Sequence, residues 1–399
     1  MSLVLHHRGF GRLWLGELVS MIGDWLTYVA VGVLAVQQGG PWAILGVLLA
    51  HTVPRALVAP WAGRVADLHD RRRVLALGSV ARGVTVLGMV LAAAQGSTGW
   101  LQAMLVLRMA TGAFVDAAAG AAVPRLVPGA ALARAHALLG STWSVVFGAG
   151  VAAGGVATAM LGPVGVLVLD ALTFFVAALL FAGLPPLRPL ASGGDEGRAG
   201  SWDEVLRELA ERPVLRRAVL AKAPVMIANG GGWVLLHVVA GSQSGAAMAL
   251  VLGALHLARA VGTGLGPLLW LRVSALRGTE LGLRASTALV LVGVSAFALA
   301  GDPLGWAGGA LLWGLGMGSH WATAATRVQG LGPDPIRGRL TAIDLVTHTV
   351  GQGVGGVLGV LALGLALPCG PAVVGAAIPV ALLTWVTIEG GARRVLARA

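Results

Sequence analysis

Apolar stretches of about 20 residues recur along the whole chain between short polar breaks. A helix needs about 20 apolar residues to cross the roughly 30 Å hydrocarbon core of a bilayer. Hydrophobic residues make up 57% of the 399-residue chain and charged residues only 11%, which excludes an ordinary soluble surface. We therefore predict an all-α membrane protein with twelve transmembrane helices. The predicted spans are residues 13–36, 42–62, 74–94, 100–123, 136–161, 163–184, 214–240, 246–271, 281–300, 305–326, 340–366 and 370–388.

Basic residues occur in only one set of the loops between these spans. The loops after spans 1, 3, 5, 7, 9 and 11 contain neither lysine nor arginine, whereas the opposite loops contain Arg64, Arg71, Arg72, Arg73, Arg125, Arg134, Arg272, Arg277, Arg337 and Arg339. This positive-inside asymmetry predicts that both termini and the long central loop are cytoplasmic. It also accounts for the net charge of +11 without nucleic-acid binding.

A polar segment divides the chain into two parts. Residues 185–213, PPLRPLASGGDEGRAGSWDEVLRELAERP, separate an N-terminal half, 1–184, from a C-terminal half, 214–399. Ser201 and Glu204 form the capping box of a short amphipathic helix, whose apolar face consists of Trp202, Val205, Leu206 and Leu209. We expect this helix to lie on the membrane surface as an interfacial connector, with a regulatory docking helix as the alternative.

The two halves correspond to each other without gaps at a shift of 205 residues. The shift pairs identical residues: Arg12 with Arg217, Pro128 with Pro333, Arg134 with Arg339, Gly150 with Gly355 and Gly154 with Gly359. It predicts two parallel six-helix repeats around a central cavity. Parallel repeats are typical of transporters that bind substrate between the halves near the bilayer midplane and alternate access by rocking. Transport is therefore the leading functional hypothesis.

The stretch GRVADLHDRRRV, residues 63–74, falls in the cytoplasmic loop between spans 2 and 3. Four of its residues resemble the G-x-x-x-D-x-x-x-R-R signature of the major facilitator superfamily: Gly63, Asp67, Arg71 and Arg72. The glycine permits a close helix approach, the aspartate can cap a helix N-terminus, and the arginines can reach carbonyls or carboxylates. We expect a latch that favours the conformation closed to the cytoplasm. A plain positive-inside loop is the alternative.

A second motif in the fourth span resembles one of the same superfamily. Arg108 and Gly112 match its R-x-x-x-G core, with Thr111 where a glutamine is common. The resemblance associates this arginine with proton coupling. An arginine inside a span is costly unless it faces a cavity or a carboxylate, so a functional role is the default and structural pairing with an acid is the alternative.

Gly150, Gly154 and Gly155, in the stretch GAGVAAGG, resemble the glycine-rich fifth-helix motif of the superfamily's antiporters. Val151 stands where that motif has a proline. The proline-dependent kink is therefore missing, while close packing through small residues is retained. Helix packing alone is the alternative interpretation.

Longer stretches resemble the branch that contains bacterial siderophore exporters and macrolide efflux proteins. They are GDW (23–25), RLVPGAALARAHAL (125–138), DALTFF (170–175) and PIRGRL (335–340). The resemblance implies a twelve-helix exporter of a small molecule, driven by a proton gradient across a bacterial-type inner (plasma) membrane. We expect a monomer without a cofactor. The resemblance does not identify the substrate.

Charged residues inside the predicted spans should face protein or water, because an isolated charge in hydrocarbon costs about 3 kcal/mol or more. They are Glu17, Asp24, Arg55, Arg82, Arg108, Asp116, Asp170, Lys222, Arg259 and Asp344. Glu17 and Asp24 lie seven residues apart and share one face of the first span. Because that span carries two acids and lacks a clear small-residue cleavage site, we expect it to be retained and not cleaved as a signal peptide.

The 205-residue shift superposes Glu17 on Lys222, the only lysine, and Asp24 on Asn229. We hypothesise that Glu17 and Lys222 pair across the halves as a cytoplasm-side gate. Asp24 and Asn229 would then contact substrate or carry the coupling proton. The alternative pairs Glu17 with Arg12 and gives Asp24 a buried hydrogen bond.

Asp24 is the strongest proton-carrier candidate, because a buried carboxylate beside a movable cation can gain and lose a proton. His51, His256 and His348 are weaker candidates. The sequence has no cluster of His and Cys with metal-ligand spacing, no esterase elbow and no phosphate-binding Walker loop. We therefore expect no metal site, no catalytic residues and no enzyme activity.

The charges leave the substrate class open. Two acids in the first span suit a cationic drug, whereas the arginines and the lysine suit an anionic or zwitterionic metabolite such as a siderophore. We expect a secondary active exporter of a small amphipathic molecule, working by alternating access. A proton-coupled importer of the same fold and a membrane receptor that does not transport are the alternatives.

Overall fold

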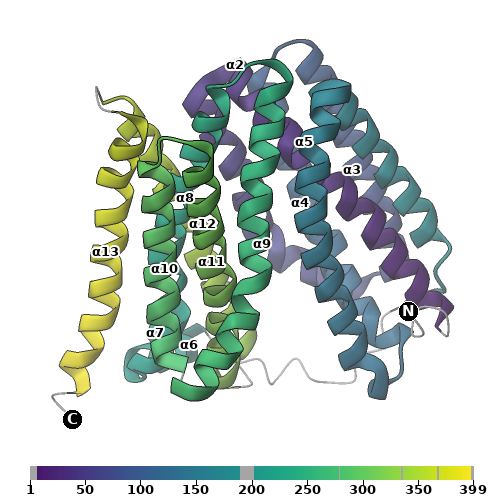
Figure 1. Ribbon diagram of the computed structural model, residues 1–399. Coiled ribbons are helices and arrows are strands. Elements are labelled where there is room, and N and C mark those ends of the chain that lie inside the picture. Colours follow the sequence, from purple (N-terminus) through teal and green to yellow (C-terminus); the bar gives the residue numbers. More distant parts are fainter. Residues whose placement is uncertain (1–6, 189–201, 278, 334–335, 366–367, 397–399) are drawn as a thin grey trace. The chain divides into compact units, whose positions relative to one another are not determined.

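The computed structural model describes residues 7–188, 202–277, 279–333, 336–365 and 368–396. The regular elements of this described part are all helices (Figure 1). In chain order they are α2 (Arg8–Leu68), α3 (Arg71–Ala94), α4 (Thr98–Leu126), α5 (Gly129–Ala182), α6 (Trp202–Glu211), α7 (Pro213–Leu220), α8 (Lys222–Gly241), α9 (Gly245–Arg277), α10 (Thr279–Leu299), α11 (Pro303–Leu331), α12 (Arg337–Leu363) and α13 (Cys369–Leu396).

Nine helices of the described part are long and apolar enough to cross a membrane. Two of them, α2 and α5, each contain two of the predicted spans, and α7 and α8 together form another of the nine. The predicted span 305–326 is helical as part of α11, but α11 is not among the nine. Its C-terminal part, GSHWATAATR, is rich in small and polar residues, which lowers its hydropathy.

Glycine separates the two spans inside each of the long helices. Gly40 in α2 has φ 59° and ψ −151°, and Gly162 in α5 has φ 70° and ψ 164°. These backbone angles are essentially restricted to glycine, so each glycine ends one helical segment. Pro41 and Pro163 follow directly, and proline is favoured at the first position of a new helix. The breaks coincide with the predicted loops after spans 1 and 5.

Large apolar side chains are exposed along several of the helices. Leu77 of α3 is 69% exposed, Leu179 of α5 is 75% exposed and Leu383 of α13 is 68% exposed. Such side chains are costly in water but favourable against lipid tails. Together with the apolar helices, they identify a multi-pass membrane protein.

The described residues group into two compact units. The first unit comprises those up to residue 188 together with Ala240–Ala254, and the second comprises those within Gly193–Val239 and Leu255–Ala399. In the first unit α5 packs against α2 and α3, and α4 packs against the same two helices (Figure 1). In the second unit α10 packs along α11, and α13 contacts α10 and α12.

Each unit has an apolar cluster near one end of its helices. In the first unit Phe10, Leu75, Val115 and Phe181 are fully or almost fully buried together. In the second unit Val205 of the short helix α6 is fully buried against a cluster that includes Leu340 of α12. The predicted amphipathic helix is thus present as α6. Ser201 of its expected capping box lies outside the described residues.

Candidate functional site

Asp24 of α2 is held by two arginines from neighbouring helices. Arg82 of α3 donates from Nη2 to both carboxylate oxygens of Asp24, at 2.7 and 2.8 Å. Arg108 of α4 donates from Nη2 to Asp24 Oδ1 at 2.5 Å. Short charge-assisted bonds of this kind are about twice as strong as neutral ones. The motif arginine therefore binds the predicted proton carrier directly.

Asp170 of α5 also belongs to this group of charges. Arg108 Nη2 also donates to Asp170 Oδ2 at 3.0 Å, and the Thr27 hydroxyl donates to the same oxygen at 2.7 Å. Asp170 and Arg108 are both fully buried. Two arginines and two aspartates from four helices thus form one connected group, which we call the arginine–aspartate network: Asp24, Arg82, Arg108 and Asp170.

Small and aromatic residues shape the space around the arginine–aspartate network. A Cβ atom on Gly23 would overlap Asp170 and Thr173, and one on Gly112 would lie 3.4 Å from Arg55 Nη2. The Arg82 guanidinium lies 4.1 Å above the Phe174 ring, and that of Arg108 lies 5.3 Å from it. A guanidinium over an aromatic face is stabilised by the quadrupole of the ring.

The arginine–aspartate network is balanced in charge but not fully hydrogen-bonded. Burying each ion costs several kcal/mol, which only close pairing can offset. In the described part, Arg82 Nε and the Nε and Nη1 atoms of Arg108 are buried without a hydrogen-bond partner. Partly satisfied buried groups of this kind are unusual in a purely structural core.

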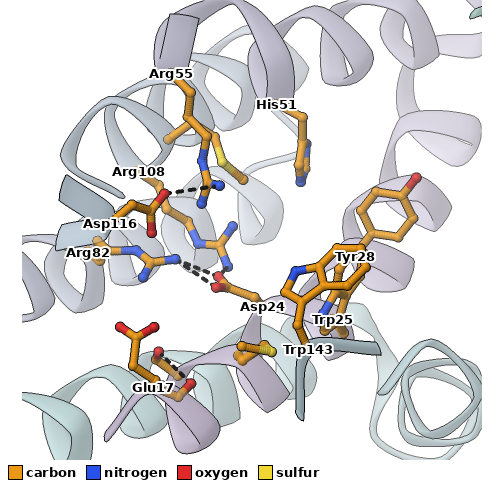
Figure 2. Close-up of a pocket in the computed structure, with 13 residues that line it drawn as sticks. Glu17, Asp24, Trp25, Tyr28, His51, Arg55, Arg82, Arg108, Asp116 and Trp143 are labelled. Carbon is orange, nitrogen blue, oxygen red and sulfur yellow. Dashed lines mark hydrogen bonds and ion pairs between the residues drawn. The ribbon is translucent and has the colours of Figure 1, made fainter. Parts of the chain in front are cut away.

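A cavity of about 380 Å³ opens beside the network within the first unit. Asp24, Arg82 and Arg108 lie in its wall (Figure 2). The remaining lining residues are Glu17, Ser20, Met21, Trp25, Tyr28, His51, Arg55, Met109, Asp116 and Trp143. Glu17 and Asp24 therefore share one cavity, as their spacing along the first span predicts.

Arg55 and Glu17 differ in how their charges are met. Arg55 Nη1 lies 3.2 Å from Asp116 Oδ2, and both side chains are about half exposed. The Glu17 carboxylate has no hydrogen-bond or ion-pair partner among the described residues. The alternative pairing of Glu17 with Arg12 is not present among the described residues, where Arg12 donates to the carbonyl oxygen of Gly183.

The second unit has its own buried ion pair. Lys222 Nζ lies 2.5 Å from Asp344 Oδ2 and 4.0 Å from the centre of the Trp321 ring. Asn229, which the 205-residue shift of the sequence superposes on Asp24, accepts a hydrogen bond from Arg259 at 3.3 Å. Lys222 thus has a carboxylate partner in its own unit. A gate with Glu17 would require it to leave Asp344.

The three histidine candidates have different surroundings. His51 lines the cavity of the first unit, where one ring nitrogen lies 3.3 Å from the carbonyl oxygen of Val47. His256 is fully buried, and its Nδ1 lies 3.5 Å from Arg259 Nη2. His348 packs edge-on against Trp321. Of the three, only His51 shares the cavity with Asp24.

The predicted latch residues lie where α2 ends and α3 begins. Arg71 Nε donates to the carbonyl oxygen of Ala66 and Arg72 Nη1 to that of Leu184, both at 3.2 Å. The cap of α3 is Asp70, which accepts from the Arg72 amide at 3.0 Å. The expected capping role of Asp67 is therefore taken by Asp70, which directly precedes α3. No described atom lies within 4 Å of the Cβ position of Gly63, so no close approach of a described helix requires this glycine.

The glycine-rich motif packs helices closely within the first unit. A Cβ on Gly150 would lie 2.7 Å from Trp25 Cβ, and one on Gly154 would lie 3.0 Å from the Trp25 carbonyl oxygen. Gly155 faces Gly253, in the part of α9 that belongs to the same unit. Small residues at such contacts let helix backbones approach each other.

Several residues of the site were not identified from the sequence motifs. Trp25 packs against Trp143 and Tyr28, with ring centres 6.0 and 5.5 Å apart, and these aromatic residues line the cavity. Thr27 and Phe174 support the arginine–aspartate network. The stretch DALTFF contains both Asp170 and Phe174. Its resemblance to the siderophore exporter and macrolide efflux branch was therefore the sequence feature that could have indicated Phe174. No group of three or more His, Cys, Asp or Glu residues suited to a metal ion occurs in the described part.

Solved transporter structures share this fold at low sequence identity. A bacterial homologue of the human lysosomal transporter Spinster, solved in an inward-facing and unoccupied conformation, is 14% identical with a TM-score of 0.69 and covers 96% of this chain and 93% of its own. A bacterial homologue of the iron transporter ferroportin is 17% identical with a TM-score of 0.66, covering 96% and 98%. The nucleoside transporter NupG is 15% identical with a TM-score of 0.69, covering 98% of each chain.

Sequence comparison gives the same classification. The uncharacterised MFS-type transporter YfiS of Bacillus subtilis (strain 168) is 29% identical over 90 residues, so the match covers 22% of this chain and 22% of that protein. The sequence profile of the Major Facilitator Superfamily matches residues 13–356, most of the chain. This multi-pass membrane transport protein therefore belongs to the major facilitator superfamily.

Proposed function

We propose that this transporter is a proton-coupled exporter of a small amphipathic molecule, working by alternating access as a monomer in a bacterial-type inner membrane. The observation that supports it most directly is the Asp24 carboxylate, which lies in the wall of a cavity and is bound by Arg82 and Arg108. Intramembrane carboxylates beside mobile cations are typical proton carriers in transporters.

The network gives a physical link between protonation and helix position. Protonation of Asp24 would remove the charge that attracts Arg82 of α3 and Arg108 of α4, so the bonds that join these helices to α2 would weaken. Arg108 would keep its contact with Asp170, whereas Arg82 would lose its carboxylate partner. The helices would then favour a different packing, which is the requirement for coupling a proton to a conformational change.

We place this mechanism in two six-helix halves, residues 1–184 and 214–399, with both termini in the cytoplasm. The motif of Gly63, Asp67, Arg71 and Arg72 would act as a cytoplasmic latch through the bonds of its two arginines. The bond from Arg72 to the carbonyl of Leu184 supports this role, because it ties the start of α3 to the chain just after α5. In the second unit Asn229 would contact substrate and Lys222 would contribute its charge.

The test is the cellular accumulation of ethidium, erythromycin and a catecholate siderophore in a host that expresses the protein. We expect at least one compound to be depleted, and both an uncoupler and Asp24→Asn to abolish the depletion. Glu208→Gln is the matched control, because Glu208 is paired with Arg212 on the helix α6 of the second unit and is not among the residues that line the cavity. This control should leave the depletion intact.

Other results would contradict the proposal in defined ways. Higher accumulation in expressing cells would reverse the direction and make the protein an importer. Depletion that survives both the uncoupler and Asp24→Asn would exclude proton coupling through Asp24. Binding of a panel compound to the purified protein without any change in accumulation would indicate a receptor.

A further inference from the structure

The cavity of the first unit contains one carboxylate whose charge no cation balances. Arg82 and Arg108 are bound to Asp24 and Asp170, and Arg55 is bound to Asp116. Three arginines therefore face four acids, and Glu17 is the acid without a partner among the described residues. With all groups ionised, the cavity and its wall carry a net negative charge.

Aromatic faces lie in the same cavity and are not used by the arginines. Arg82 and Arg108 stack on Phe174, which is fully buried behind the wall. Trp25, Tyr28 and Trp143 line the cavity instead, and Trp143 is 46% exposed. A smaller hollow of about 240 Å³ also has Glu17 and Trp143 in its wall. Glu17 and an open indole therefore border common space.

We propose that the first-unit cavity binds an organic cation with a planar aromatic group, and that Glu17 is its counter-charge. The inference rests on the proposed function, because it names the substrate class of the same cavity. A cation beside Glu17 would replace the missing ion-pair partner, and its aromatic group would stack on the tryptophans. Cations are attracted to tryptophan faces more strongly than to other aromatic rings.

The arginines do not make the same cavity suitable for an anion. The N–H groups of Arg82 and Arg108 that lack partners are buried atoms, closed to a ligand in the cavity. An anion would also meet the uncompensated Glu17 carboxylate. The flexible thioethers of Met21 and Met109 complete an apolar lining that adapts to ligands of different outline.

The test compares three ligands of nearly the same shape on the purified full-length protein by isothermal titration calorimetry. They are N-methyl-4-phenylpyridinium, its uncharged parent 4-phenylpyridine, and biphenyl-4-carboxylate. We expect the cation to bind at least about tenfold more tightly than the other two, because a charge pair in a partly desolvated site exceeds the 1.4 kcal/mol of a tenfold change. Equal binding of all three, or tighter binding of the carboxylate, would overturn the inference without any substitution.

Two variants locate the charge. Glu17→Gln should weaken cation binding by about tenfold or more and leave 4-phenylpyridine unchanged, whereas Glu17→Asp should keep most of the preference. Trp143→Leu should weaken the cation by a few-fold. Glu208→Gln is the control for removal of a carboxylate that does not line the cavity. A cation preference that survives Glu17→Gln would refute the role of Glu17.

The outcome is separable from that of the proposed function. If the cation binds as expected but no panel compound changes its accumulation, the cation site stands and the exporter proposal fails. If a compound is expelled through a proton-coupled process but the cation does not bind preferentially, the exporter proposal stands and the cation site is wrong.

Discussion

The two units bury their charges in different arrangements. In the first unit four charged side chains from four helices meet beside a cavity of about 380 Å³. In the second unit the buried Lys222 and Asp344 form a pair that links α8 to α12. At the position that the 205-residue shift pairs with Asp24, the second unit has the amide of Asn229, which cannot carry a proton at neutral pH. The comparison favours the first unit as the place for the proposed proton coupling.

The largest expected effect comes from removing Arg108. Arg108→Ala leaves the buried Asp170 without its guanidinium and removes one of the two cations from Asp24. Breaking a buried pair costs about 3–5 kcal/mol, and we expect the upper end because two carboxylates are affected. Thermal unfolding in detergent measures this loss. A loss below about 1 kcal/mol would show that Arg108 is not the centre of the network.

Lys222→Met should cost less, about 3 kcal/mol, because it removes the partner of a single carboxylate. The double variant Lys222→Met/Asp344→Leu should recover most of that loss, since an apolar pair leaves no buried charge. If the second unit uses this pair only to join α8 and α12, the double variant should also transport. A stable double variant without transport would instead show that the charge of Lys222 takes part in transport.

Two glycines of the first unit differ in how closely their surroundings are packed. Gly23→Ala places a Cβ against Asp170 and Thr173, so it should destabilise the protein by about 1–3 kcal/mol and impair transport. Gly63→Ala fills open space within a helix and should be neutral or stabilising by up to about 1 kcal/mol. Unfolding measured on both variants tests this difference, and a similar loss in the two would contradict the packing described.

The smallest expected effect is that of Arg55→Gln. The Arg55–Asp116 pair is about half exposed in the cavity, and exposed pairs contribute about 0.2–1 kcal/mol. The unfolding temperature of Arg55→Gln should therefore differ little from that of the unaltered protein. A loss of stability as large as that of Arg108→Ala would mean that the exposed pair and the buried network contribute equally to the stability of the protein.

The sequence predicted the helices well, because apolar length and Gly-Pro breaks are local signals. Gly40-Pro41 and Gly162-Pro163 separate spans as expected. The sequence also placed Glu17 and Asp24 on one face of one helix. These features depend on residues that are neighbours along the chain.

The partners of the charges were not predictable, because they lie on different helices. The sequence marked Arg82, Asp170 and Asp344 as charges that need a partner, but helix packing decides which charges meet. The 205-residue shift suggested Lys222 for Glu17, whereas Lys222 contacts Asp344 in its own unit. Likewise the motif suggested Asp67 as a helix cap, whereas the residue that directly precedes α3 and caps it is Asp70.

The assignment of proton coupling to Asp24 is tested most directly by measuring proton movement in proteoliposomes. The vesicles contain a pH-sensitive dye, and the transported compound is one that cells are found to expel. We predict that the unaltered protein couples movement of this compound to a counterflow of protons. Asp24→Asn should still exchange labelled for unlabelled compound across the membrane but move no protons. Proton flux that persists in Asp24→Asn would contradict the assignment of coupling to Asp24.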